Sequence, residues 1–162
     1  MIEALLISTV LASGSTLPPH ATAYRFEQFG VSPETIASPA QPKLASKRAR
    51  LFRKELRREA ADGPNFAGHL RVAEWGCGAC CVDFAIIDLE TGNVWMPGFY
   101  ISCGYPQTDP VRGQAGLYFR EDSALFVAIG SKSEGPTAAV YYYRWNGRGL
   151  ELLGADLERQ NE

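Results

Sequence analysis

The residues of this chain best suited to chemistry are its four cysteines, three of which fall within one short segment at Cys77, Cys80 and Cys81. Cys77 and Cys80 have the CxxC spacing of thiol-disulfide enzymes, in which a helix beginning at the motif lowers the thiolate pKa. A strand-like run follows the motif here, so a thiol-disulfide protein using Cys77 and Cys80 is an alternative interpretation only. Adjacent cysteines seldom both reach one metal, and we therefore expect no metal site built from these residues and Cys103.

A structural disulfide is the favoured interpretation of the same residues. It would clamp the glycine-containing turn between two strands, provided that the chain reaches an oxidising compartment. We expect Cys77 to pair with Cys81 in the first place and with Cys103 in the second. Four cysteines allow three full connectivities, and the sequence alone does not choose among them.

General acid–base chemistry would be drawn from His69 and a carboxylate. Histidine titrates near neutral pH, and a neighbouring carboxylate can orient its ring or share in proton transfer. His69 and Asp83 are the catalytic candidates, with Glu74 and Asp88 as further carboxylates. No spacing rule joins them, and the sequence has no phosphate-loop, HExxH, GxSxG or EF-hand pattern. We therefore expect no cofactor, and an envelope enzyme using His69 and a nearby carboxylate is an alternative function.

The elements that must position these residues follow from periodicity and turn residues. Ser46 suits an N-cap, and an apolar stripe predicts one basic helix over 46–61, ended by Gly63 and Pro64. Tight turns between the later elements require antiparallel neighbours. Runs rich in β-branched and aromatic residues predict strands near 67–75, 82–89, 94–96, 116–120, 124–130, 138–145 and 149–153.

Two stretches of the chain resemble each other. FAIIDLETGNVW and YYYRWNGRGLEL each consist of a strand-like run, a glycine turn and a second run. Such units resemble propeller blades, although two of them cannot close a ring. We therefore predict an α+β fold that is mainly an antiparallel β meander, open or folded over, with one N-terminal basic helix packed on it.

The first 23 residues differ in kind from the rest. They contain a short apolar run, ALLISTVLA, and end in ATA, which fits a signal peptidase site. We expect 1–23 to be a signal peptide, with a buried N-terminal strand or helix as the alternative. The run is shorter than the roughly 20 apolar residues that a transmembrane segment requires. Residues 24–45 contain three prolines and predict an extended arm outside the core, opening with a short strand at 24–29, before a single domain over 46–162.

Charge is unevenly distributed. The formal net charge of -2 gives no global field that points to nucleic acid, which is also not expected for an exported protein. The predicted helix nevertheless carries seven basic residues against Glu55 and Glu59. This surplus could dock an anionic surface or an acidic envelope protein, whereas intramolecular pairing with carboxylates of the sheet is the alternative. The residues expected to contact such a partner are Arg50, Arg53, Arg57 and Arg58.

Strand alternation assigns further candidate binding residues. Tyr141, Tyr143 and Trp145 share one face of the 138–145 run, and Arg71 and Trp75 share one face of the first predicted strand. These five side chains could line a ligand surface. The alternative is that the tyrosine and tryptophan stripe belongs to the core, where such side chains bury a large area.

Several motifs resemble those of a family of uncharacterised, mostly exported bacterial proteins. They are GPNFAGH at 63–69, WGCG at 75–78 with a further cysteine at Cys81, a strand ending in IDLETG, YFREDSALFV at 118–127 and YYYRW at 141–145. The resemblance implies a Cys77–Cys81 disulfide and transfers no reaction. Together these observations predict an exported, periplasmic, noncatalytic binding or interaction protein with a disulfide-pinned loop.

Overall fold

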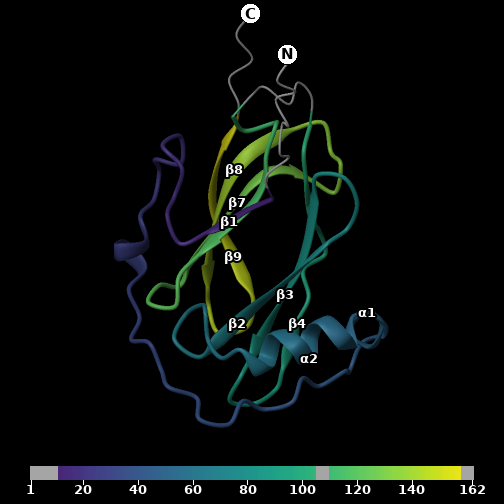
Figure 1. Ribbon diagram of the computed structural model, residues 1–162. Helices are drawn as coiled ribbons and strands as arrows, with labels where there is room; N and C mark the ends of the chain where they lie inside the picture. Colours follow the sequence, from purple (N-terminus) through teal and green to yellow (C-terminus); the bar gives the residue numbers. More distant parts are fainter. Residues whose placement is uncertain (1–10, 105–109, 158–162) are drawn as a thin grey trace, which may run out of the picture.

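A nine-stranded sheet with two helices and a short 3₁₀ turn forms the fold of the computed structural model, which describes residues 11–104 and 110–157 (Figure 1). Hydrogen-bonded strands follow the order β1-β6-β7-β5-β3-β2, while β4 pairs with β3, and β8 joins β7 to β9. The strands are β1 (Leu11–Gly14), β2 (Leu70–Gly76), β3 (Cys81–Asp88), β4 (Val94–Trp95), β5 (Ile101–Ser102), β6 (Ala115–Phe119), β7 (Leu125–Lys132), β8 (Ala138–Trp145) and β9 (Leu150–Leu157).

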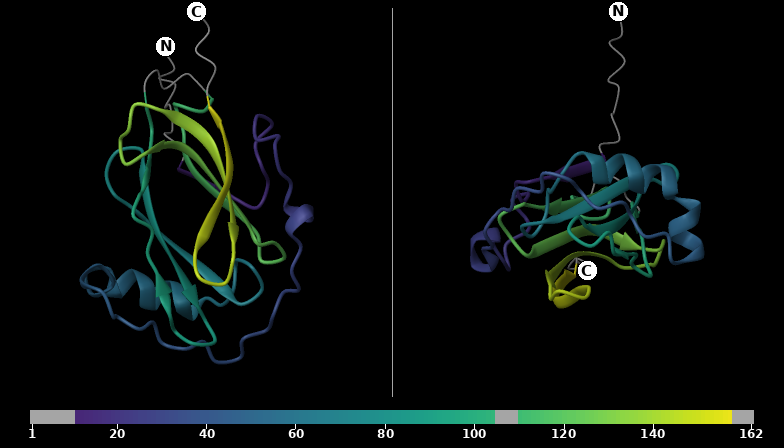
Figure 2. Two further views of the ribbon diagram at one scale, coloured as in Figure 1. Left: turned by 180° about the vertical axis from the view of Figure 1, so that it is seen from behind. Right: turned by 90° about the horizontal axis from the view of Figure 1, so that it is seen from below.

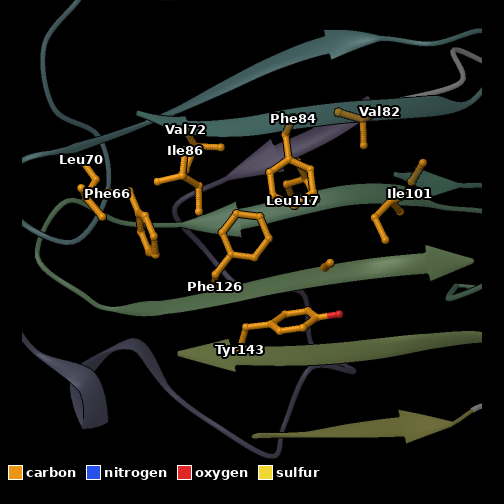
Figure 3. Packing of buried hydrophobic residues seen from close by; sticks show 12 residues of the cluster. Phe66, Leu70, Val72, Val82, Phe84, Ile86, Ile101, Leu117, Phe126 and Tyr143 are labelled. Carbon is orange, nitrogen blue, oxygen red and sulfur yellow. The ribbon is translucent and has the colours of Figure 1, made fainter. Parts of the chain in front are cut away.

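The sheet is folded over at β5, and the main core lies between its two halves. β5 has only two residues, yet it pairs with the start of β3 on one side and with the end of β7 on the other. Phe84 of β3 stacks on Phe126 of β7 with ring centroids 5.0 Å apart, so the two halves face each other (Figure 3). This arrangement confirms the α+β class and the mainly antiparallel sheet. The similarity to propeller blades remains a prediction.

The two helices, α1 and α2, form a helical layer that covers the outer face of β2 and β3, as the views in Figure 2 show. Ser46 caps the layer, because its Oγ accepts a 2.9 Å hydrogen bond from the Ala49 amide. The prediction of one continuous helix was wrong, since α1 (Lys47–Leu51) and α2 (Arg53–Ala61) are separated at Phe52. The Phe52 ring stacks on Trp75 at 4.5 Å, and this tertiary contact accompanies the break. Neither helix of the described chain is long and apolar enough to cross a bilayer.

The arm contributes to a second core cluster, on the other face of β7 and β8. Its first turn is a 3₁₀ helix, η1 (Phe26–Phe29), so the predicted strand at 24–29 was wrong. Phe26 is only 4% exposed, and it packs in one cluster with Val127 and Tyr142. The expectation that the arm lies outside the core was therefore also wrong, because an aromatic ring can fill a gap in a sheet surface without belonging to a regular element.

β5 was missed by the sequence analysis, whereas β1 agrees with its alternative of an N-terminal strand. β1 lies parallel to β6, with Leu11 opposite Ala115, and it falls inside the segment expected to be a signal peptide. Ala21, at the expected cleavage site, is fully buried in the second cluster. Removal of 1–23 remains a prediction, and it would leave the outer edge of β6 without this partner.

Candidate functional site

The GPNFAGH motif forms the turn that presents His69. The Asn65 side chain bonds both backbone groups of Val72, accepting from its amide at 2.7 Å and donating to its carbonyl at 3.1 Å. Phe66 is fully buried in the main core. Gly68 has φ +88°, a conformation that disfavours any side chain, and a Cβ there would lie 3.0 Å from the Ser32 carbonyl oxygen. The motif therefore fixes the backbone before His69 and lets the arm approach it closely.

His69 lies among three carboxylates that come from two separate segments. Its Nδ1 is 3.0 Å from Glu34 Oε1 of the arm, and its Nε2 is 3.9 Å from both Asp88 Oδ1 and Glu90 Oε2. Asp88 and Glu90 belong to the IDLETG motif, which forms the turn after β3. Asp88 Oδ1 also accepts hydrogen bonds from the amides of Glu90 and Thr91, which holds its carboxylate in place. We name Glu34, His69, Asp88 and Glu90 the histidine cluster.

The histidine cluster can support two kinds of chemistry. Potential ligand atoms of Glu34, His69 and Glu90 lie within 4.8 Å of one another, a donor set that suits a divalent cation. Alternatively, a carboxylate bonded to Nδ1 orients the ring so that Nε2 can take up or release a proton. All four side chains are partly exposed, with Glu34 and Glu90 about half exposed.

Asp83 does not join this cluster. Its side chain is 9% exposed, and Oδ1 lies 2.5 Å from Arg48 Nη2 of α1. The same oxygen accepts a 2.9 Å hydrogen bond from the Phe84 amide. The structure therefore uses Asp83 to hold the helical layer on the sheet, and the pairing of His69 with Asp83 considered from the sequence is not formed.

The cysteines form two pairs. Cys77 pairs with Cys81, with Cα atoms 5.1 Å apart, which confirms the first predicted pairing. Cys80 pairs with Cys103, with Cα atoms 5.5 Å apart, so the second predicted pairing of Cys77 with Cys103 was wrong. Cys77 and Cys80 belong to different disulfides, and β3 follows them where a redox motif requires a helix. The CxxC alternative therefore loses its structural basis.

Two of the predicted binding residues have partners within the fold. Arg71 Nη2 lies 2.8 Å from Glu59 Oε2, and its Nη1 donates to the Gly63 carbonyl, so this side chain anchors the end of α2. Trp75 packs in the cluster beneath the helices through its stack on Phe52. Both residues share a face, as alternation predicted, but that face is the one that the helical layer covers.

The aromatic stripe of β8 also faces the protein interior. Tyr143 is 4% exposed in the main core, and Tyr141 and Trp145 pack against the same core from its edge. The three side chains share one face, as predicted. For most of this stripe, burial in the core explains the aromatic residues better than a ligand surface does. Of the three stripe residues, Trp145 lines a hollow of about 340 Å³. In this hollow its ring packs edge to face against Trp95, with ring centroids 5.9 Å apart. Asp88 of the histidine cluster lines the same hollow.

The basic residues of α1 and α2 divide into two groups. Arg48 has a carboxylate partner in Asp83, and Arg58 lies 3.2 Å from Glu59. Within the described residues, the others have no carboxylate oxygen within 4.0 Å, so the intramolecular pairing considered from the sequence does not account for them. We name these exposed residues the basic face: Lys47, Arg50, Arg53, Lys54 and Arg57.

An exposed leucine lies inside the basic face. Leu51 is 70% exposed, at the end of α1. It lines an open hollow of about 530 Å³ together with Lys47, Arg48, Arg50 and Arg53. An exposed apolar side chain beside cationic neighbours suits an anionic partner that also carries an apolar side chain.

Comparison of the chain with protein-family models, curated proteins and solved structures gave no match. The family resemblance carried by the GPNFAGH and IDLETG motifs thus remains a prediction. The structure adds that these two motifs, separated along the chain, meet at the histidine cluster.

Proposed function

We propose that this protein is an exported, noncatalytic interaction protein that docks an acidic partner protein on its basic face. The observation that carries the proposal is a set of five exposed cationic side chains with no carboxylate partner among the described residues, on the same two helices as the exposed Leu51. Charge complementarity accelerates association and excludes like-charged partners, while a central apolar contact supplies affinity. A protein partner is favoured over a flat membrane surface because Leu51 lines a hollow that an anchoring side chain could fill.

Export and a periplasmic location are part of the same proposal. The signal-peptide pattern in 1–23 and two disulfides support it, because such crosslinks persist in oxidising compartments. Cell fractionation combined with thiol labelling tests this part. A protein found in the cytosol with all four thiols free would contradict it.

The docking test compares two sets of four neutralising substitutions. The first set, R50Q, R53Q, K54Q and R57Q, removes charge from the basic face. The control set, which neutralises four exposed basic residues elsewhere, is R25Q, K43Q, R144Q and R148Q. Both sets remove four positive charges, so the two variants have equal net charge. A difference in partner capture between them therefore reports the position of the charges and not their total.

Each variant and the wild type are used to capture partners from the native envelope at two salt concentrations, and to sediment with phosphatidylglycerol vesicles. We expect the wild type and the control set to capture an acidic protein that the helical set does not capture. This capture should weaken at the higher salt concentration. Equal capture by both sets would refute docking on the basic face. Vesicle binding that is lost in the helical set but kept in the control set would assign the face to a membrane surface instead.

An envelope enzyme that uses His69 is a second candidate. The 3.0 Å contact between Nδ1 and Glu34 supports it, because this contact orients the ring as general acid–base catalysis requires. The test replaces His69 by Ala and follows both the phenotype and the free energy of unfolding. A lost phenotype in a fold of unchanged stability would favour catalysis, whereas a joint loss would make the histidine cluster a structural tie between the arm and the sheet.

A further inference from the structure

Lys132, the last residue of β7, extends its amine into a group of aromatic rings. Its Nζ is 4.1 Å from the ring centroid of Tyr141, 5.0 Å from that of Tyr143 and 4.8 Å from that of Phe99. Ring faces attract a cation, so this arrangement stabilises the ammonium. Aromatic carbon, however, does not replace the oxygen acceptors that an ammonium with three N–H donors normally finds.

Two polar groups in this group of rings lack a hydrogen-bond acceptor among the residues 11–104 and 110–157. Within the described part of the chain, Lys132 Nζ has no hydrogen bond and no carboxylate oxygen within 4.0 Å. Among the same described residues, the buried Tyr143 hydroxyl also has no hydrogen-bond partner. In Figure 3 this hydroxyl points along β8 toward the end of the sheet at which β7 finishes, where Lys132 lies. Buried polar groups are satisfied in the great majority of proteins, so such a pair calls for an explanation.

We propose that Lys132 and Tyr143 bind the carboxylate of a small organic acid with an apolar body. A carboxylate is an acceptor only, and its two oxygens can satisfy one ammonium and one hydroxyl together. The rings of Phe99 and Tyr141 would then contact the apolar body. This site lies at the main core and away from the basic face, so it goes beyond the proposed docking function.

The protonation states of the neighbouring groups agree with this role. Burial raises the pKa of Tyr141 and of Tyr143, so both phenols stay protonated and Tyr143 remains a donor at neutral pH. Burial lowers the pKa of Lys132, and a bound carboxylate would favour its charged form again. Binding should therefore make the Lys132 amine less reactive toward acylating reagents.

The chain contains only four lysines, which makes this reactivity measurable within one sample. The wild-type protein is acetylated with limiting N-hydroxysuccinimidyl acetate, with or without benzoate, and the modified residues are quantified by mass spectrometry. Benzamide, which has the same shape and no charge, is the matched control ligand. Lys43, Lys47 and Lys54 serve as internal references.

We expect saturating benzoate to slow acetylation of Lys132 by about tenfold, the effect of a charge-assisted hydrogen bond, and to leave the three reference lysines unchanged. Benzamide should have little effect. Equal protection of all four lysines, or protection by benzamide as strong as by benzoate, would overturn the proposal.

Two variants separate binding from folding. Tyr143→Phe removes only the hydroxyl, and because this group has no partner in the described part of the chain, the fold should keep its stability while benzoate binds about tenfold more weakly. Lys132→Met keeps an apolar side chain among the rings and should abolish benzoate binding, whereas Lys54→Met should leave it unchanged. Nuclear magnetic resonance titration with benzoate measures both affinities. Unchanged benzoate affinity in Tyr143→Phe would refute the proposed role of the hydroxyl. A large loss of stability in Tyr143→Phe would show that the hydroxyl has a structural partner, which also contradicts the proposal.

Discussion

Removal of the Cys80–Cys103 disulfide should destabilise the protein more than removal of Cys77–Cys81. Cys80 immediately precedes β3, and Cys103 immediately follows β5, the two-residue strand at which the sheet folds over. The Cys103 amide also donates a 2.9 Å hydrogen bond to the Cys80 carbonyl, so the crosslink reinforces the joint between the two halves. We therefore expect this bond to matter most for the tertiary arrangement.

The magnitude follows from the length of chain that each crosslink closes. The chain-entropy relation gives about 3.4 kcal/mol for a crosslink spanning 23 positions and about 1.9 kcal/mol for one spanning 4. The double variant C80A/C103A should thus lose about 1.5 kcal/mol more than C77A/C81A. Both cysteines of a pair are replaced together, so that no unpaired thiol remains to exchange.

The assay is urea unfolding under nonreducing conditions, followed by tryptophan fluorescence. Cys81 is 5% exposed, so its replacement by alanine also removes buried contacts. The same proteins measured in dithiothreitol report this packing loss by itself, because no crosslink is then present. If, after subtraction, C77A/C81A costs as much as C80A/C103A or more, the loop-closure reasoning is wrong.

Three further changes test other parts of the structure. Replacing Arg48 by alanine leaves the buried carboxylate of Asp83 without its partner and should lower the unfolding free energy by about 2–3 kcal/mol, measured in urea; an unchanged midpoint would contradict a stabilising role for this pair. Burial raises the pKa of Tyr142 from 10.0 to about 12, so the folded state holds a proton that the unfolded state releases; stability should fall as pH rises from 10 toward 12, and less steeply in Tyr142→Phe. Gly68→Ala places a Cβ 3.1 Å from Glu34 Oε1 at a φ of +88° and should cost about 1–2 kcal/mol, with faster amide exchange in the arm; unchanged exchange would show that the arm does not depend on this close approach.

Much of the sheet could be predicted because its strands have local signals. β3 carries a nearly continuous apolar run and is buried at seven of its eight positions. Alternation in β2 correctly separated Val72, which faces the main core, from Ala73, which faces the helices. β5 was missed because two residues carry no periodicity, and its existence depends on partners supplied by β3 and β7.

Half of the histidine cluster was predicted from the sequence, and its pairings were not. His69 and Asp88 were both identified from the sequence, whereas Glu34 and Glu90 were not. Glu34 lies 35 positions before His69, in an arm without periodicity, and no spacing rule links two such residues. The signal that was available is the IDLETG motif, which contributes both Asp88 and Glu90.

Lys132 shows the same limitation more sharply. As a single lysine two positions after the strand predicted at 124–130, it gave no indication of a site. Its aromatic neighbours come from β8 and from the segment before β5, and only the folding of the sheet brings them together.

Local features could be derived from the order of the amino acids: which runs form strands, where Ser46 starts the helical layer, which side chains of β2 and β8 share a face, and that Cys77 and Cys81 are close enough to pair. These depend on the order and chemistry of neighbouring residues. Other features appear only in the folded protein: the sheet folds over at β5, Cys80 pairs with Cys103, Arg48 contacts Asp83, and Glu34 of the arm contacts His69. Those contacts join residues far apart in the chain, and their energies depend on distances that close only when the whole core packs.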